Sequence, residues 1–127
     1  MKPKLMMLLA ISLQVSLPGA DRLEPSPDDD FVDEVWAKVG ELSCLKCHNS
    51  SGEAEDSRFI LRETILLDAA EVQTAHEDNF NAFAKMARMR KAGQLPRLLL
   101  KPIGELDHEG EQVLKPDSTG HAILQAF

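Results

Sequence analysis

The chain has 127 residues, the size of one domain, and 43% of them are hydrophobic, as in an ordinary globular protein. Its 21 acidic residues outnumber 14 basic ones, which gives a net charge of −7. This balance argues against nucleic acid as a partner, because binding to nucleic acid depends on neutralising phosphates. Five Phe, one Trp and no Tyr are a thin aromatic supply for a core, so a bound apolar cofactor would contribute noticeably to stability.

Residues 1–20 have the pattern of a secretory signal peptide. Lys2 and Lys4 form a basic start, Leu5–Leu17 is an apolar run, and Pro18–Ala20 is a short turn. The run is too short and too interrupted to span a bilayer comfortably. We therefore expect a cleaved signal, no stable membrane span after cleavage, and an exported protein in the periplasm or at the cell surface.

Cleavage would also change the charge of the mature chain. It removes Lys2 and Lys4 and no acidic residue, so the net charge becomes −9. An acidic surface suits a basic partner met by electrostatic steering, although solubility alone explains it equally well. Residues 21–28, which include two prolines, read as a flexible leader, and residues 29–127 are the expected domain.

The first helix is predicted from about Asp30 to Leu42. Asp28–Asp30 supply an N-cap and negative charge at its start. Apolar residues then recur with the 3.6-residue period of an amphipathic helix. These residues are Phe31, Val32, Val35, Trp36, Val39 and Leu42.

The middle of the chain predicts a turn, two ambiguous runs and a second helix. Residues 49–52 form the turn, and residues 59–61 and 65–67 are short apolar runs that fit a strand or one helical turn equally well. Residues 68–91 predict a longer helix, with a break near residues 77–79 where Asn79 would cap a second segment.

The last third predicts a turn-rich loop and a short helix. Pro102–Gly104 turns the chain, and His108 follows in the loop. Ser118 is placed to cap a final helix that carries Ile123 and Leu124.

Cys44-Leu45-Lys46-Cys47-His48 is the most specific chemical signal in the sequence. It is C-x-x-C-H, the attachment sequence of a c-type haem. Two thiols three residues apart can form thioethers with the two vinyl groups of one porphyrin, and the adjacent histidine can bind the iron as its proximal ligand. The expected cofactor is one covalent haem c, held by Cys44, Cys47 and His48.

Other uses of the two cysteines fit less well. Zinc needs four ligands in a closed site, and the chain has no second C-x-x-C. Thioredoxin-like chemistry places the motif in a βαβ unit, whereas here a helix precedes it and a polar turn follows. A disulfide across so short a loop would gain little. A haem-free redox or metal protein remains the alternative.

The sequence resembles the planctomycete-type cytochrome c-like domains over residues 31–127. The resemblance rests on the attachment motif and on softer matches around it: Ser43–Asn49, Gly52–Ala54, Ser57–Leu61, Leu98–Pro102, His108–Gly110 and Pro116–Ser118. Domains of that family occur on exported proteins of unsettled role. The family tends to have His-x-Gly-Gly at the segment His108–Glu111, so Glu111 replaces the second glycine. A glycine at that position can supply a positive φ.

The resemblance implies a mainly α, class I cytochrome c-like helical domain around one covalent haem. In such domains the first helix packs against the C-terminal helix. Phe31, Val35, Trp36 and Val39 would then meet Ile123, Leu124 and Phe127.

His108 is the best candidate for the distal iron ligand. It lies in the loop between the second and last helices, where class I cytochromes generally place that ligand. Met86 and Met89 are the alternatives, but methionine at helical spacing is more often core filler. We expect His76 to lie on a solvated helix face and His121 to be exposed or to take part in capping.

The predicted function is that of an exported electron carrier with one haem and a redox partner protein that is basic. No nucleophile–base pair indicates a substrate-converting enzyme. The alternative within the haem proteins is a sensor or accessory module with an open or exchangeable sixth ligand.

Overall fold

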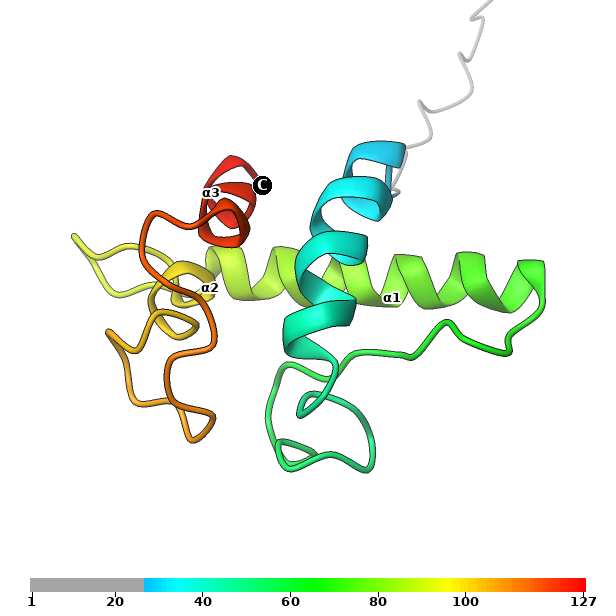
Figure 1. Cartoon of the computed structure of the whole chain (residues 1–127), viewed down its shortest axis with the longest axis horizontal. Helices are drawn as coiled ribbons and strands as arrows, with labels where there is room; N and C mark the ends of the chain where they lie inside the picture. Colours follow the sequence, from blue (N-terminus) through cyan, green and yellow to red (C-terminus); the bar gives the residue numbers. More distant parts are fainter. Residues whose placement is uncertain (1–26) are drawn as a thin grey trace, which may run out of the picture.

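The computed structural model describes residues 27–127 (Figure 1). The predicted signal peptide and most of the predicted leader lie outside the described residues. Within residues 27–127 the chain has no β-strand and consists of the helices η1 (Phe31–Cys44), α1 (Ala69–Arg88), α2 (Arg97–Leu100) and α3 (Thr119–Ala126). The prediction of a mainly α domain is confirmed. Of the helices described, none has the length and apolar character needed to cross a membrane.

Helix η1 carries the predicted apolar stripe into the core. The Asp28 carboxylate accepts a hydrogen bond from the Phe31 N–H at 2.9 Å and caps the helix start. At the other end the Leu45 N–H donates to the Gly40 carbonyl at 2.8 Å, across five residues as in a π-helix. The predicted end at Leu42 was two residues short, because this wider turn continues to Cys44. The first cysteine therefore belongs to the helix and is buried.

Helix α1 is continuous, so the predicted break near residues 77–79 was wrong. Asp68 and Glu71 form a complete capping box at its start. Asn79 does not cap a second segment. It is fully buried on the core face of α1, in the same row as Ala75, Phe83 and Met86.

The buried Asn79 side chain holds the extended segment that precedes α1. Its Oδ1 accepts from the Arg62 N–H at 2.7 Å, and its Nδ2 donates to the Arg62 carbonyl at 2.9 Å. Both backbone groups of one residue are thereby satisfied by one amide. Residues 59–61 therefore form neither a strand nor a helical turn. Their side chains at Phe59 and Leu61 are nevertheless buried in the core.

Helix α3 closes the core against η1, as the resemblance implied. Ser118 caps it by accepting from the His121 N–H at 3.3 Å, which confirms the predicted N-cap. The centroid of the Phe31 ring lies 5.8 Å from that of Phe127 and 5.7 Å from that of Phe83, which is on α1. Most of the chain's few aromatic rings are therefore concentrated in one cluster.

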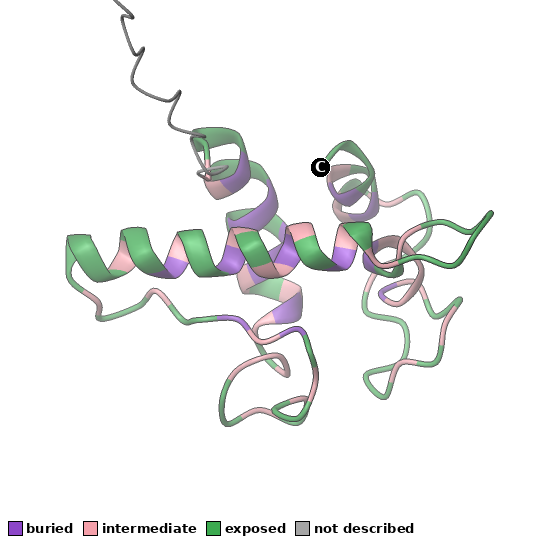
Figure 2. Cartoon of the chain, turned by 180° about the vertical axis from the view of Figure 1, so that it is seen from behind, coloured by how far each residue is buried: buried purple, intermediate pink, exposed green. Residues whose placement is uncertain are grey.

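The helices leave two loops on one side of the molecule. In Figure 1, η1 crosses α1, and α2 and α3 lie near the C-terminal end of α1. The loop after η1 and the loop before α3 both extend below α1 in this view. Figure 2 shows that the buried residues gather where the helices face one another. The two loops carry the residues of the site described next.

Candidate functional site

The Cys44–His48 segment forms a tight turn at the end of η1. The His48 N–H donates to the Cys44 carbonyl at 3.0 Å, and the Cys47 N–H donates to the same oxygen at 3.3 Å. Cys44 is buried and Cys47 is half-buried, and both are free thiols. The Cys47 thiol lies 3.9 Å from the Glu53 carboxylate.

Gly52 allows the chain to fold back closely over this turn. The Ala54 N–H donates to the Cys47 carbonyl at 3.0 Å. A Cβ at position 52 would lie 2.2 Å from that carbonyl oxygen. Any residue other than glycine would therefore force the backbone to move. The glycine is therefore required by a close approach of two backbone segments.

His48 is oriented by Ser57 and Phe59. The Ser57 hydroxyl donates its only proton to the Phe59 carbonyl at 3.1 Å and lies 3.2 Å from His48 Nδ1. Because that proton is already used, the hydroxyl accepts from Nδ1–H, which leaves the lone pair on Nε2. The Phe59 ring lies edge-on to the imidazole, with centroids 5.0 Å apart. A fixed tautomer of this kind is what a metal-binding histidine needs.

Burial sets the protonation of two of the motif residues. It lowers the pKa of His48 below the ordinary value of 6.5, and the charges of His108 and Lys101 act in the same direction while the Phe59 carbonyl opposes them. His48 is therefore neutral at pH 7, as a metal ligand must be. Burial, followed by the neighbouring Cys47, raises the pKa of the Cys44 thiol to about 12.

His108 is held by a turn of its own loop. The Glu111 N–H donates to the His108 carbonyl at 2.7 Å, and His108 Nδ1 donates to the Glu111 carbonyl at 2.8 Å. A carbonyl can only accept, so the proton is on Nδ1 and the lone pair again on Nε2. A Cβ at Gly110 would lie 3.3 Å from the His108 ring, which packs over the glycine.

Glu111 has φ +56°, the left-handed conformation that glycine adopts most easily. This is the position at which the chain departs from the His-x-Gly-Gly pattern. Glu111 thus adopts the positive φ that glycine would otherwise supply. The turn is thus retained at the cost of some backbone strain.

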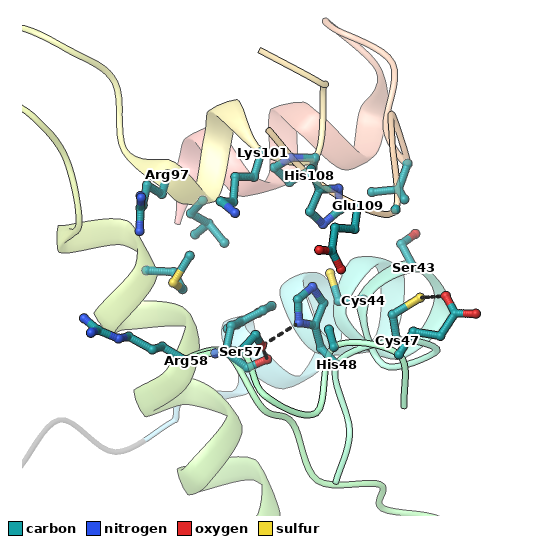
Figure 3. Close-up of a pocket in the computed structure, with 18 of the residues that line it drawn as sticks. Ser43, Cys44, Cys47, His48, Ser57, Arg58, Arg97, Lys101, His108 and Glu109 are labelled. Atoms are coloured by element: carbon teal, nitrogen blue, oxygen red, sulfur yellow. Dashed lines mark hydrogen bonds between the residues drawn. The ribbon is translucent and has the colours of Figure 1, made fainter. Parts of the chain in front are cut away.

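His48 and His108 reach into one cavity from the two loops (Figure 3). Their ring centroids are 6.0 Å apart and their planes differ by 15°. A metal bound on opposite sides by one ring nitrogen of each, at about 2.0–2.1 Å, would hold the ring centres roughly 6 Å apart. The two residues that sequence reasoning singled out as proximal and distal ligands therefore lie at one cavity, with stacked rings whose centres have a spacing compatible with one shared metal.

The cavity has a volume of about 830 Å³ and a mixed lining of apolar, polar and charged side chains. This is within the 300–1,000 Å³ of typical cofactor sites. Cys44, Cys47, Met86 and Met89 also line it, so both alternative methionine ligands face the same space. Met86 is buried and belongs to the hydrophobic core.

The remaining histidines lie elsewhere. His76 is half-buried on α1, and its ring lies edge-on to that of Trp36 at 6.3 Å, so it is only partly solvated. His121 is buried rather than exposed, and its Nδ1 accepts from the Asp117 N–H at 3.3 Å. Neither lines the cavity.

Sequence reasoning missed the roles of two supporting residues: Ser57 had no assigned role, and Asn79 was expected to cap a helix. Ser57 lies within a matched segment, two residues before a buried aromatic residue, and this spacing was the available signal. Asn79 falls on the apolar row of its helix, where a polar residue predicts a specific partner. The identity of that partner, 17 residues earlier in the chain, could not be read locally.

No family model, no curated protein and no solved structure matches this chain. Within residues 27–127, no group of three or more His, Cys, Asp or Glu side chains is arranged to hold a metal ion. The site is therefore interpreted from its own geometry.

Proposed function

We propose that the protein is a c-type cytochrome domain that carries single electrons. Cys44 and Cys47 would hold one haem covalently, and His48 and His108 would bind its iron from opposite sides. The resemblance to planctomycete-type cytochrome c-like domains supports the same interpretation.

The observation that carries the proposal is the paired arrangement of the two imidazoles. Each ring has its Nδ1–H engaged by a protein oxygen, and each therefore offers Nε2 as the free acceptor. Their centroids lie 6.0 Å apart across a cavity that also contains both thiols. Two imidazoles and two thiols around one cavity match the needs of a covalent haem.

The chain's own residues would perform three tasks. The thiols would tether the porphyrin, the Ser57 hydroxyl and the Glu111 carbonyl would keep the two imidazoles in their tautomers, and Met86, Leu98 and Leu124 would form an apolar wall against it. When bound, the haem iron supplies the one-electron chemistry. Two histidine ligands leave no open position for a substrate, which favours electron transfer over catalysis.

The proposed setting is outside the cytoplasm, with a basic redox protein as partner. The signal peptide predicted over residues 1–20 and the acidic balance of the remaining chain support this setting.

A second candidate function is ligand sensing at an exchangeable sixth position. It is favoured by the placement of His108 on an exposed turn whose last residue, Glu111, is in the left-handed conformation. Binding of carbon monoxide by the reduced protein without loss of its fold would favour sensing over simple electron transfer.

The variant His108→Ala tests the axial pair. We expect its Soret and charge-transfer bands to differ from those of the wild type, because one nitrogen ligand is lost, while Met86→Leu and Met89→Leu keep the wild-type bands. If a methionine variant changes the spectrum and His108→Ala does not, the assignment of His108 is wrong.

A further inference from the structure

A second hollow lies where η1, α1 and α3 meet, and it has a volume of about 720 Å³. We call it the acidic groove; the residues used to describe it are Asp30, Glu34, Phe80, Ala84, Ala126 and Phe127. In Figure 1 the two loops of the cavity extend below α1, whereas the N-terminal half of η1 and α3 lie above it. No residue lines both the groove and the cavity. A molecule bound in the groove would therefore leave the cavity free.

The floor of the acidic groove is apolar and reaches solvent. The small residues Ala84 of α1 and Ala126 of α3 line it, together with the larger Phe80 and Phe127, whose ring centroids are 5.9 Å apart. Ala126 and Phe127 are exposed, and Phe80 and Ala84 are half-buried. Small side chains beside large ones leave room for an apolar side chain from outside, and an exposed apolar hollow with a polar rim is typical of a protein interaction site.

The rim of the groove is acidic on the η1 side. Asp28, Asp30 and Glu34 line it, and all three are exposed. Asp28 caps the helix and Glu34 pairs with Lys38, whereas Asp30 forms no ion pair within residues 27–127. Arg88 is the basic residue of the lining and lies at the end of α1. A partner's cations would therefore find complementary charge along η1.

We propose that the acidic groove binds a basic amphipathic helix of another protein. Its apolar side chains would enter the hollow over Ala84 and Ala126, and its lysine or arginine side chains would meet Asp30 and Glu34. A helix suits this place because the walls of the groove are themselves helix surfaces, and an amphipathic helix in an apolar groove is a common mode of recognition. The inference does not rest on the proposed function. A partner held here would tether the domain and leave the cavity uncovered.

The test measures the binding of a defined peptide to the purified full chain by fluorescence anisotropy. The probe is a labelled helix-forming peptide of about 15 residues that carries leucine on one face and lysine beside it. A second peptide has glutamate in place of every lysine. We expect the lysine peptide to bind and the glutamate peptide not to bind, because the rim is acidic.

The double variant Asp30→Asn/Glu34→Gln tests the charge of the rim. It should weaken binding of the lysine peptide about fivefold, because two exposed ion pairs are lost. Asp29→Asn/Asp33→Asn is the matched control, since it removes the same charge from neighbouring exposed residues that do not line the groove. The measurement is made at physiological ionic strength, where charges more than about 8 Å apart are largely screened. Equal effects of the two double variants would overturn the proposal, because general acidity would then explain the attraction.

A bulky side chain in the hollow tests its shape. Ala84→Trp should weaken binding about tenfold or more by filling the space that a partner's apolar side chain needs. Ala126→Trp, in the exposed last turn of α3, serves if circular dichroism shows that Ala84→Trp does not fold. Ala37→Trp is the matched control, because Ala37 is exposed on η1 and does not line the groove.

Two results would overturn the proposal. One is wild-type affinity for the lysine peptide in a folded tryptophan variant of the groove. The other is self-association of the protein that Ala84→Trp abolishes, without binding of the peptide, since the groove would then hold a second copy of this chain.

Discussion

Replacing the buried Asn79 by leucine should destabilise the domain through two unmade hydrogen bonds. Leucine has a similar size but cannot bond the Arg62 N–H and carbonyl, which Asn79 contacts at 2.7 and 2.9 Å. An unsatisfied buried polar group costs about 1–3 kcal/mol. Arg62 is itself exposed, so water reaches part of its backbone, and the lower end of that range applies to each group. We therefore expect a loss of about 2 kcal/mol in the free energy of unfolding.

Urea unfolding followed by far-ultraviolet circular dichroism measures this change. A domain of this size should show a fall in Tm of about 10 °C in parallel. Gln73→Leu is the matched control, because Gln73 is an exposed amide on the same helix that bonds only to Glu77 across one turn. Its effect should stay within about 0.5 kcal/mol. If Asn79→Leu costs no more than Gln73→Leu, Asn79 does not hold the extended segment as described.

Two further predictions concern the loops of the site. Glu111→Gly should stabilise the protein by about 0.5–1 kcal/mol in urea unfolding, because it removes the left-handed backbone cost of about 1–2 kcal/mol and adds a smaller glycine entropy cost. Glu111→Ala should leave the free energy of unfolding nearly unchanged, because alanine bears the same left-handed cost. Equal effects of the two substitutions would contradict a backbone origin. In haem-free protein at pH 8, iodoacetamide should modify Cys47 well before Cys44, because burial raises the pKa of the Cys44 thiol to about 12 and the thiolate is the reactive form. Mass spectrometry of partly modified protein checks the order, and preferential labelling of Cys44 would contradict it.

Local patterns were sufficient for η1 and for the start of α3, but they predicted a break in α1 that is absent and did not predict the short helix α2. The apolar stripe of η1 and the Ser118 cap are set by residues within one or two turns, so both were predicted to within two residues. His121 takes part in capping α3, as one of the two expected alternatives had it, but it is buried because it lies three residues before Leu124 and shares its buried face. Two apolar positions in so short a helix were too few to define that face in advance.

Long-range contacts account for what the sequence could not specify. The role of Asn79 depends on a partner 17 residues away, and the cavity lining brings Arg58 together with Arg97 of α2 across almost forty residues. His108 was singled out by its position in the chain and by the family resemblance, but its separation of 6.0 Å from His48 appears only in the folded structure. Residues within one helix or turn were predictable, whereas contacts between elements required the fold.

The pyridine haemochrome spectrum tests the central claim most directly. The full chain is produced in cells that attach haem to exported proteins, beside a Cys44→Ala/Cys47→Ala control, and non-covalent haem is extracted from both. We expect the wild type to retain one haem per chain with a c-type spectrum and the control to lose it. A wild-type protein that gives no c-type spectrum under these conditions would contradict the account.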